Sequence, residues 1–219
     1  MIKAVIFDMD GLMLDTEILL QRFWIEAAGL FGYEMSKETE LGLRSYSSVY
    51  SINYLKRNFG ENFPFADVRA KRIELMNDYI KRNGLKKKKG LDVLLDYIKS
   101  TDLKAAVCTA TDFERTKKYL ESVEVFDKFD DFVCGNMVAR GKPAPDIYEY
   151  ACKKLGLEPC ECIALEDSPN GVISAAVAGL APIMVPDLTK PSADIKPLLF
   201  AECESLDKVV DILSKKIAR

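Results

Sequence analysis

Five short apolar runs, each ending in polar or turn-forming residues, constrain the fold of this chain more than any other feature. They lie at residues 2–7, 105–108, 132–134, 163–165 and 183–185. Runs without polar alternation are typical of strands that are buried on both faces of a parallel sheet. Helical patterns lie at residues 113–122, 145–155, 169–178 and 206–217, and Pro and Gly mark several of their ends. Because strands alternate with helices, we expect an α/β protein with a doubly wound parallel sheet.

Residues 16–87 have a different pattern, because their apolar residues recur at helical spacing and no short buried run is evident. Two stripes have this spacing, with Leu19, Phe23, Ala27 and Leu30 in one and Val68, Ile73, Met76 and Ile80 in the other. We therefore expect a helical insert over residues 16–87, within a core made of residues 1–15 and 88–219. Four consecutive lysines, at 86–89, are interpreted as a solvated return linker, with attraction of phosphate as the alternative.

Composition and charge exclude several classes of function. The chain has 219 residues, 48% of them hydrophobic, and its 34 acidic and 31 basic residues give a net charge of −3. With no overall positive field, we expect no nucleic-acid and no membrane partner.

No apolar run approaches the roughly 20 residues that cross a bilayer, and the N-terminus enters the first run directly, so we expect a cytoplasmic protein. We also expect a monomer. The lack of histidine excludes Ser-His-Asp and Cys-His nucleophile activation and His-based zinc sites.

Acidic residues follow the first and fourth runs. Asp8 and Asp10 end the first run, and Glu166 and Asp167 end the fourth. The carboxyl ends of parallel strands meet at one edge of a sheet, where ligands bind. Clustered carboxylates repel one another unless a cation holds them, so the pattern suggests a divalent metal site with one oxygen free to attack an electrophile. The alternatives are a strand-ending turn at Asp-x-Asp-Gly and capping of the next helix by Asp167.

Residues that suit an anion follow the second and third runs. Thr109 and the backbone N–H groups near Ala110 can hold anionic oxygens at the entrance to a helix, although a threonine there can also serve only as an N-cap. Pro143 restricts Lys142 to extended conformations, which aims its side chain, although a lysine can also be merely solvated. Together with the acidic groups, these residue types match phosphoryl transfer, which needs a nucleophile, a metal and groups that bind phosphate.

Four motifs occur in a fixed order along the chain. They are Phe7-Asp8-Met9-Asp10-Gly11-Leu12 with Asp15-Thr16-Glu17, Cys108-Thr109-Ala110-Thr111, Gly141-Lys142-Pro143-Ala144-Pro145-Asp146, and Glu166-Asp167-Ser168-Pro169-Asn170-Gly171-Val172. In this order they resemble the haloacid dehalogenase-like hydrolase superfamily, specifically its branch of β-phosphoglucomutases and small sugar-phosphate or nucleotide phosphatases. The resemblance covers nearly the whole chain. It implies a Rossmann-like core with a helical cap inserted after the first strand, which agrees with the apolar patterns.

The resemblance also implies a Mg²⁺-dependent reaction through an aspartyl-phosphate. Asp8 would attack phosphorus. Asp10 would protonate the leaving oxygen, then activate water, and would bind Mg²⁺ through its backbone carbonyl. The other implied residues are the metal-site carboxylates Asp8, Glu166 and Asp167, the phosphoryl-binding Thr109, Ala110 and Lys142, and Thr16 at the hinge into the cap and beside the substrate.

Departures from the mutase pattern favour hydrolysis. β-Phosphoglucomutases place a histidine near the start of the cap, where this chain has Leu20 and Gln21, and they use a cap arginine where this chain has Ser48. We therefore expect a phosphatase that acts on a small phosphomonoester, either a sugar phosphate or a nucleotide-like compound. The alternatives are a hexose-phosphate mutase, in which Arg44 compensates for Ser48, and a phosphometabolite-binding protein without turnover. Expected substrate contacts from the cap, with a plain surface position as the alternative for each, are Arg44, Tyr46, Ser47 and Lys71.

Overall fold

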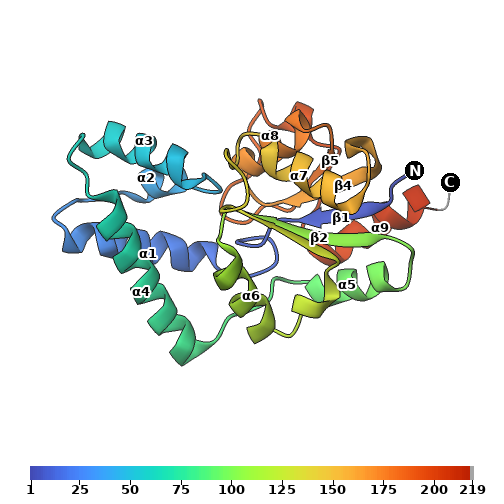
Figure 1. The fold of residues 1–219 in the computed structure, drawn as a ribbon, viewed down its shortest axis with the longest axis horizontal. Coiled ribbons are helices and arrows are strands. Elements are labelled where there is room, and N and C mark those ends of the chain that lie inside the picture. The colour runs from blue at the N-terminus through green and yellow to red at the C-terminus, as the bar shows by residue number, and fades with distance from the viewer. Residues whose placement is uncertain (218–219) are drawn as a thin grey trace.

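The computed structural model describes residues 1–217 and is built on one parallel sheet (Figure 1). Its strands lie in the order β3-β2-β1-β4-β5-β6, and all neighbouring pairs are parallel. Their bounds are β1 Ala4–Phe7, β2 Lys104–Thr109, β3 Asp131–Cys134, β4 Cys162–Glu166, β5 Ala181–Met184 and β6 Ala201–Glu202. The strand order reverses at β1, so the carboxyl ends of β1, β2 and β4 form the crevice where ligands bind in such sheets. The expected α/β fold with a doubly wound parallel sheet is confirmed.

Helices cover both faces of this sheet. Their bounds are α5 Leu91–Lys99, α6 Phe113–Ser122, α7 Asp146–Leu155, α8 Pro169–Val177 and α9 Leu206–Ile217, with short 3₁₀ helices at Phe126–Lys128, Pro159–Glu161 and Lys196–Leu198. Val5 and Phe7 of β1 pack with α5, α6 and α9, whereas Ala4 and Ile6 pack with α7 and α8. This division follows from strand geometry, because successive side chains point to opposite faces. None of the described helices combines the length and the hydrophobicity needed to cross a membrane.

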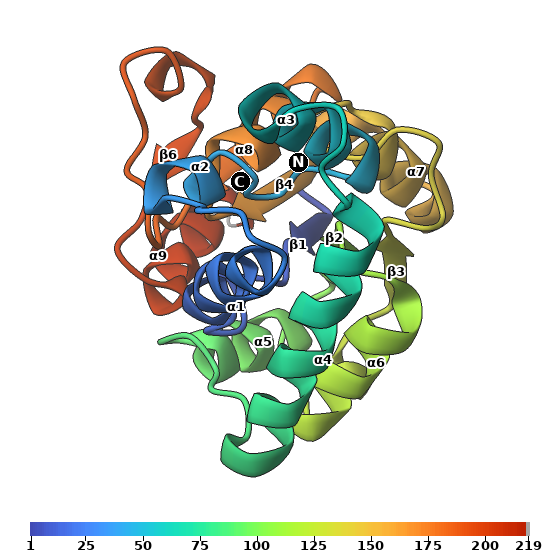
Figure 2. The same ribbon diagram turned by 90° about the vertical axis from the view of Figure 1, so that its left-hand side faces the viewer.

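The helical insert (residues 16–87) stands at one end of the sheet (Figure 1), and its helices lie in front of the strands in Figure 2. Its helices are α1 Glu17–Leu30, α2 Lys37–Leu41, α3 Ser48–Phe59 and α4 Phe65–Asn83. The insert has an apolar cluster of its own, which includes Trp24, Ala28 and Leu55. The predicted stripe on α1 is wrong at Leu30, which is 62% exposed. The reason is that α1 turns Trp24 and Ala28 toward the interior of the insert, so its last residue faces solvent.

Two linkers join the helical insert to the core, and they run side by side. Leu14 and Lys87 form an antiparallel bridge, and backbone hydrogen bonds flank it on both sides. The Lys88 ammonium lies 2.7 Å from Asp187 Oδ1 and 3.4 Å from Asp15 Oδ1. The other lysines of the return linker are exposed, as expected for a solvated segment. Lys88 instead ties the linker to the loop that follows β5.

Candidate active site

Asp8 and Lys142 form a buried ion pair at the carboxyl edge of the sheet. Asp8 follows β1 and is 3% exposed, and Lys142 lies between β3 and α7 and is 0% exposed. The Lys142 Nζ lies 2.5 Å from Asp8 Oδ1 and 2.6 Å from Glu166 Oε1, and it donates to the Cys108 carbonyl at 2.9 Å. These contacts use all three donors of the ammonium. Lys142 therefore has a fixed position, and it fixes the Asp8 carboxylate.

Burial and charge oppose each other in this pair. Burial raises the pKa of Asp8 well above its ordinary value, and the Lys142 ammonium works against this rise. Burial lowers the pKa of Lys142, but the carboxylates of Asp8 and Glu166 outweigh burial and raise it. Lys142 therefore stays cationic at neutral pH. Its charge favours the ionised form of Asp8, which is the form that can attack an electrophile.

Three carboxylates gather beside this lysine. Ligand oxygens of Asp8, Glu166 and Asp167 all lie within 4.8 Å of one another, and all three residues are buried. Asp8 Oδ2, Glu166 Oε2 and Asp167 Oδ1 have no hydrogen-bond partner within the described part of the chain. Buried carboxylate oxygens without partners are costly, and three of them together fit a hard divalent cation such as Mg²⁺. The meeting of these groups was expected from the ends of β1 and β4.

Two glycines make room for these carboxylates. Gly11 has a φ of +85°, which favours glycine, and a Cβ there would collide with the side chains of Asp167 and Glu17. Gly171 lies in the first turn of α8, where a Cβ would overlap the Glu166 carboxylate. Both glycines belong to the sequence motifs described above. Their bare backbones allow acidic side chains from distant parts of the chain to come together.

Asp10 lies next to this group but is held by hydroxyls. The Thr16 hydroxyl donates to Asp10 Oδ1 at 2.7 Å, and the Thr111 hydroxyl donates to Asp10 Oδ2 at 2.8 Å. Thr16 precedes α1 and Thr111 follows β2, so the insert and the core both position this carboxylate. No histidine is needed to orient Asp10. Thr16, which was expected beside the substrate, has its hydroxyl on Asp10 and does not line the pocket.

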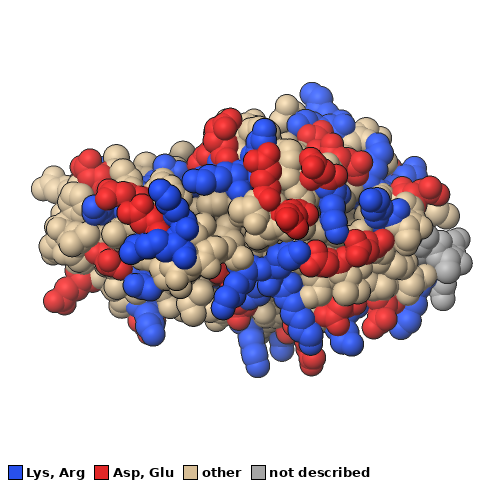
Figure 3. Space-filling view, turned by 90° about the horizontal axis from the view of Figure 1, so that it is seen from below, with Lys and Arg blue, Asp and Glu red and all other residues tan. Residues whose placement is uncertain are grey.

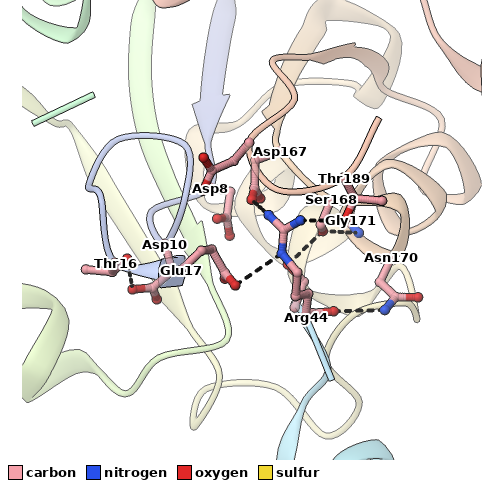
Figure 4. Close-up of polar contacts among 12 residues, drawn as sticks. Asp8, Asp10, Thr16, Glu17, Arg44, Asp167, Ser168, Asn170, Gly171 and Thr189 are labelled. Carbon is pink, nitrogen blue, oxygen red and sulfur yellow. Dashed lines mark hydrogen bonds and ion pairs between the residues drawn. The ribbon is translucent and has the colours of Figure 1, made fainter. Parts of the chain in front are cut away.

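Arg44 joins the helical insert to the acidic end of β4 (Figure 4). Its Nε donates to Glu17 Oε2 at 3.1 Å, one terminal nitrogen donates to Thr189 Oγ1 at 2.9 Å, and the other pairs with Asp167. The Asn170 side chain donates to the Arg44 carbonyl at 2.8 Å. Burial raises the pKa of Asp167 to about 7, and the guanidinium of Arg44 opposes this rise. These contacts hold the insert closed against the core.

A pocket between the insert and the core opens onto these groups. Its residues from the strand ends are Asp8, Asp10, Thr109 and Ala110. From the insert, Arg44 and Tyr46 also line it, and their contact with a substrate stays a prediction. Ser47 does not line it: its backbone N–H donates to the Lys142 carbonyl at 3.3 Å, and its side chain packs against Gly141. Lys71 is also outside the lining and forms an ion pair within α4 at 2.8 Å.

Several residues of the site had no role in the sequence predictions. Thr111 binds Asp10, Glu17 binds Arg44, and the Tyr148 hydroxyl donates to Glu166. Thr111 had a readable signal, because it lies two residues after Thr109 at the same strand end. Tyr148 had none, because it lies within α7 and meets Glu166 only through the packing of that helix on the sheet.

Comparison with known proteins identifies the family. The model of the haloacid dehalogenase-like hydrolases matches residues 2–179, a range that contains all four motifs. This chain belongs to the haloacid dehalogenase-like hydrolase family. The resemblance inferred from the motifs is thereby confirmed, and the protein is an enzyme of the hydrolase class.

Relatives of this hydrolase are similar over most of their length. It is 31% identical over 194 residues to the putative phosphatase YhcW of Bacillus subtilis, covering 85% of this chain and 84% of the relative. It is 27% identical over 220 residues to hexitol phosphatase B of Escherichia coli K12, covering 99% of this chain and 96% of the relative. The crystal structure of CbbY from Rhodobacter sphaeroides in complex with phosphate aligns with a TM-score of 0.79 and 26% identity. The alignment covers 95% of this chain and 96% of CbbY.

Proposed function

We propose that this haloacid dehalogenase-like hydrolase is a phosphatase that cleaves a small phosphomonoester, a sugar phosphate or a nucleotide-like compound, through an aspartyl-phosphate on Asp8. One observation carries the proposal. Asp8 lines the pocket with Oδ1 held by Lys142, and its Oδ2 has no hydrogen-bond partner among residues 1–217. The phosphatase names of relatives from Bacillus subtilis and Escherichia coli support this type of reaction.

In the first step, a carboxylate oxygen of Asp8 attacks phosphorus and the bond from phosphorus to the leaving oxygen breaks. Asp10 gives that oxygen a proton, so that an alcohol leaves. The Thr109 hydroxyl and the Ala110 N–H bind oxygens of the phosphoryl group. The Thr109 oxygen accepts a hydrogen bond from the Thr111 N–H at 3.1 Å, so its own proton is free to donate to the phosphoryl group.

In the second step, Asp10 is a carboxylate and takes a proton from water. The water oxygen attacks phosphorus, the bond from phosphorus to Asp8 breaks, and inorganic phosphate leaves. Asp10 must therefore exist in two protonation states while it keeps its position. The hydroxyls of Thr16 and Thr111 serve both states, because a hydroxyl can donate to a carboxylate oxygen or accept from a protonated one.

The carboxylates of Asp8, Glu166 and Asp167, together with the Asp10 carbonyl, would hold Mg²⁺. When bound, the ion supplies positive charge beside the transferring phosphoryl group and offsets the repulsion among the carboxylates. Lys142 and the Tyr148 hydroxyl orient Glu166 through its Oε1. The other oxygen of Glu166 is thereby directed away from these partners and remains available as a ligand.

A screen of phosphomonoesters with Mg²⁺ tests the proposed function. Hexose, pentose, nucleotide and glycolate phosphates should be compared by kcat/KM, with release of inorganic phosphate as the signal. Release from at least one ester is the expected result. Interconversion of hexose phosphates without net release would show a mutase instead, and inactivity across the panel would show a binding protein.

Replacement of the nucleophile gives a sharper test. Asp8→Asn should lower kcat by about 1,000-fold or more, because an amide is a poor nucleophile at phosphorus. Asp92→Asn is the matched control, since Asp92 lies at the start of α5 and pairs with Lys87 at 2.7 Å. Activity of Asp8→Asn within about tenfold of the control would contradict the role of Asp8.

A further inference from the structure

Three arginines line the pocket away from the strand ends. This arginine cluster consists of Arg69 and Arg72 of α4 and Arg115 of α6. The two helices are also joined directly, because the Tyr119 hydroxyl donates to Asn77 Oδ1 at 3.3 Å. Seen from below, Lys and Arg side chains gather near the middle of the molecule, in the region of α6 (Figure 3). The cluster therefore places three cations at the junction between the helical insert and the core.

Arg72 is the most buried member of the cluster and has no anionic partner. It is 6% exposed, and no carboxylate among the described residues lies within ion-pair distance of it. Its Nε has no hydrogen-bond partner in the described chain, and a terminal nitrogen reaches only the Met76 sulfur at 3.9 Å. A buried charge without a partner is strongly unfavourable. Burial, with the charges of Arg115 and Arg69, lowers the pKa of Arg72 to about 9.

Stacking on Trp24 does not explain this arrangement. The Arg72 guanidinium carbon lies 5.1 Å from the centre of the Trp24 ring, which is a cation–π contact. The ring attracts the Arg72 cation but offers no acceptor oxygen. The N–H donors of the guanidinium still need acceptor oxygens. The contact with Trp24 therefore leaves these donors unsatisfied.

The other two arginines are also incompletely paired. Arg115 lies 2.8 Å from Asp112 Oδ2, but its buried Nε has no hydrogen-bond partner within residues 1–217. Arg69 is half-buried and forms no ion pair with another described residue. Burial and the neighbouring Arg115 lower the pKa of Arg69. The three cations therefore repel one another, and among the described residues only Arg115 has a carboxylate at ion-pair distance, that of Asp112.

Nearby carboxylates offset this charge only in part. Asp10 faces Arg72 but forms no ion pair with it among the described residues, and both of its oxygens accept hydrogen bonds from threonine hydroxyls. Glu40 also faces Arg72, and burial raises its pKa to about 7. Part of the Glu40 population is therefore uncharged at neutral pH. The pocket keeps an excess of positive charge and unused guanidinium donors on the side formed by α4 and α6.

We propose that the arginine cluster binds a second anionic group of the substrate, a carboxylate or a phosphate, remote from the phosphoryl group that Asp8 attacks. This inference rests on the proposed function and narrows the substrate to a phosphomonoester with an anionic group at each end. Guanidinium groups suit this task, because their planar N–H pairs match two oxygens of a carboxylate or a phosphate. Cations that are already gathered and partly desolvated bind an anion with little reorganisation.

Three esters that differ at one end test the inference. They are the monophosphate of propanediol, the bisphosphate of propanediol and the phosphate ester of hydroxypropanoate, each with its functional groups at opposite ends of the propane chain. We expect kcat/KM for the two doubly anionic esters to exceed that for the alcohol by roughly 10- to 100-fold, the effect of one or two charged hydrogen bonds. Whichever of these two esters has the higher kcat/KM shows whether the cluster prefers phosphate or carboxylate.

Arginine variants locate the effect. Arg72→Gln and Arg69→Gln should each reduce the advantage of the doubly anionic esters over the alcohol. Arg69 provides a variant that does not disturb the contact with Trp24. Arg82→Gln is the matched control, because it removes the same charge from an exposed position on α4, where Arg82 Nε donates to the Asp78 carbonyl at 3.0 Å. It should leave the ratio of specificity constants unchanged.

Calorimetry separates this inference from the proposed function, because it needs no turnover. Propane bisphosphonate should bind the wild-type protein roughly 10- to 100-fold more tightly than propylphosphonate, and Arg72→Gln should remove most of that difference. Equal binding of the two phosphonates by the wild-type protein would overturn the inference. The inference is also overturned if the ratio of kcat/KM for a doubly anionic ester to kcat/KM for the alcohol is the same in Arg72→Gln and Arg82→Gln. If no ester releases phosphate, the proposed function fails, and calorimetry still decides the inference.

Discussion

At the scale of single residues, the acid–base group depends on two hydroxyls from different parts of the protein. Thr111→Val keeps the shape of the side chain and removes the donor to Asp10 Oδ2. We expect kcat to fall by about tenfold with little change in KM, because Asp10 then loses one of the two contacts that orient it. Steady-state kinetics measures this. Thr101→Val, which removes a hydrogen bond to the Ile98 carbonyl at the end of α5, is the control. A kcat equal to that of the control would contradict the positioning role.

Glu40 gives a prediction about pH and stability. Burial raises the pKa of Glu40 from 4.5 to about 7, so the folded protein holds this proton more tightly than the unfolded chain. The resulting contribution to stability is complete below pH 4.5 and is lost as pH rises through 7. Glu40→Gln cannot titrate. It should therefore reduce the loss of stability between about pH 5 and pH 8 by about 1–3 kcal/mol.

Urea unfolding at several pH values measures this effect. The free energy of unfolding of the wild-type protein should fall more steeply with pH than that of Glu40→Gln. Glu34→Gln is the control, because Glu34 is exposed in the segment between α1 and α2. If Glu40→Gln and Glu34→Gln show the same slope, Glu40 does not titrate as its burial implies.

The gathering of the acidic groups could be predicted because it depends only on topology. Once strands are parallel, the residues after β1 and β4 share an edge, and Asp8, Glu166 and Asp167 must come close. Contacts such as that of Arg72 with Trp24 could not be predicted, since they depend on how one helix packs against another. The catalytic, substrate-binding and metal-binding roles of these residues stay predictions.

At the scale of elements, the helical insert has its own apolar cluster and should be sensitive to a cavity there. Leu55 of α3 is 0% exposed within that cluster. Leu55→Ala should lower the free energy of unfolding by about 2–5 kcal/mol, through lost burial and the cavity left behind. Leu30→Ala is the control, because Leu30 is 62% exposed and its truncation should cost less than about 0.5 kcal/mol. Denaturant unfolding compares them, and equal losses would show that α3 contributes little to folding.

Two elements of the core were missing from the sequence predictions, for different reasons. Helix α5 begins directly after the lysine linker, and no helix was predicted at that place. Its buried residues Leu91, Leu94, Leu95 and Ile98 have clear helical spacing, so the signal was present. Strand β6 has only two residues and pairs with Ile183 and Met184 of β5. So short a strand has no periodicity, and only its partner in the sheet defines it.

At the scale of the whole molecule, we expect the three gathered carboxylates to make stability and activity depend on a divalent cation. A chelator should abolish phosphatase activity, and added Mg²⁺ should restore it. Mg²⁺ should also raise the midpoint of thermal unfolding, because binding at a hundredfold excess over Kd stabilises the folded state by about 2.7 kcal/mol. Sodium chloride at equal ionic strength is the control. Full activity in chelator, or equal midpoints in the two salts, would contradict a metal site at Asp8, Glu166 and Asp167.

The adjacent linkers also bear on how such an enzyme acquires new preferences. Because the chain leaves the core at Leu14 and returns at Lys87, directly beside its point of departure, residues 16–87 form a cassette with neighbouring ends. A different cassette can be spliced across the same junction without moving β1 or the nucleophile that follows it. A replaced segment would have to keep the Thr16 hydroxyl and the Arg44 guanidinium, which contact Asp10 and Asp167, and its other pocket-lining residues would be free to differ.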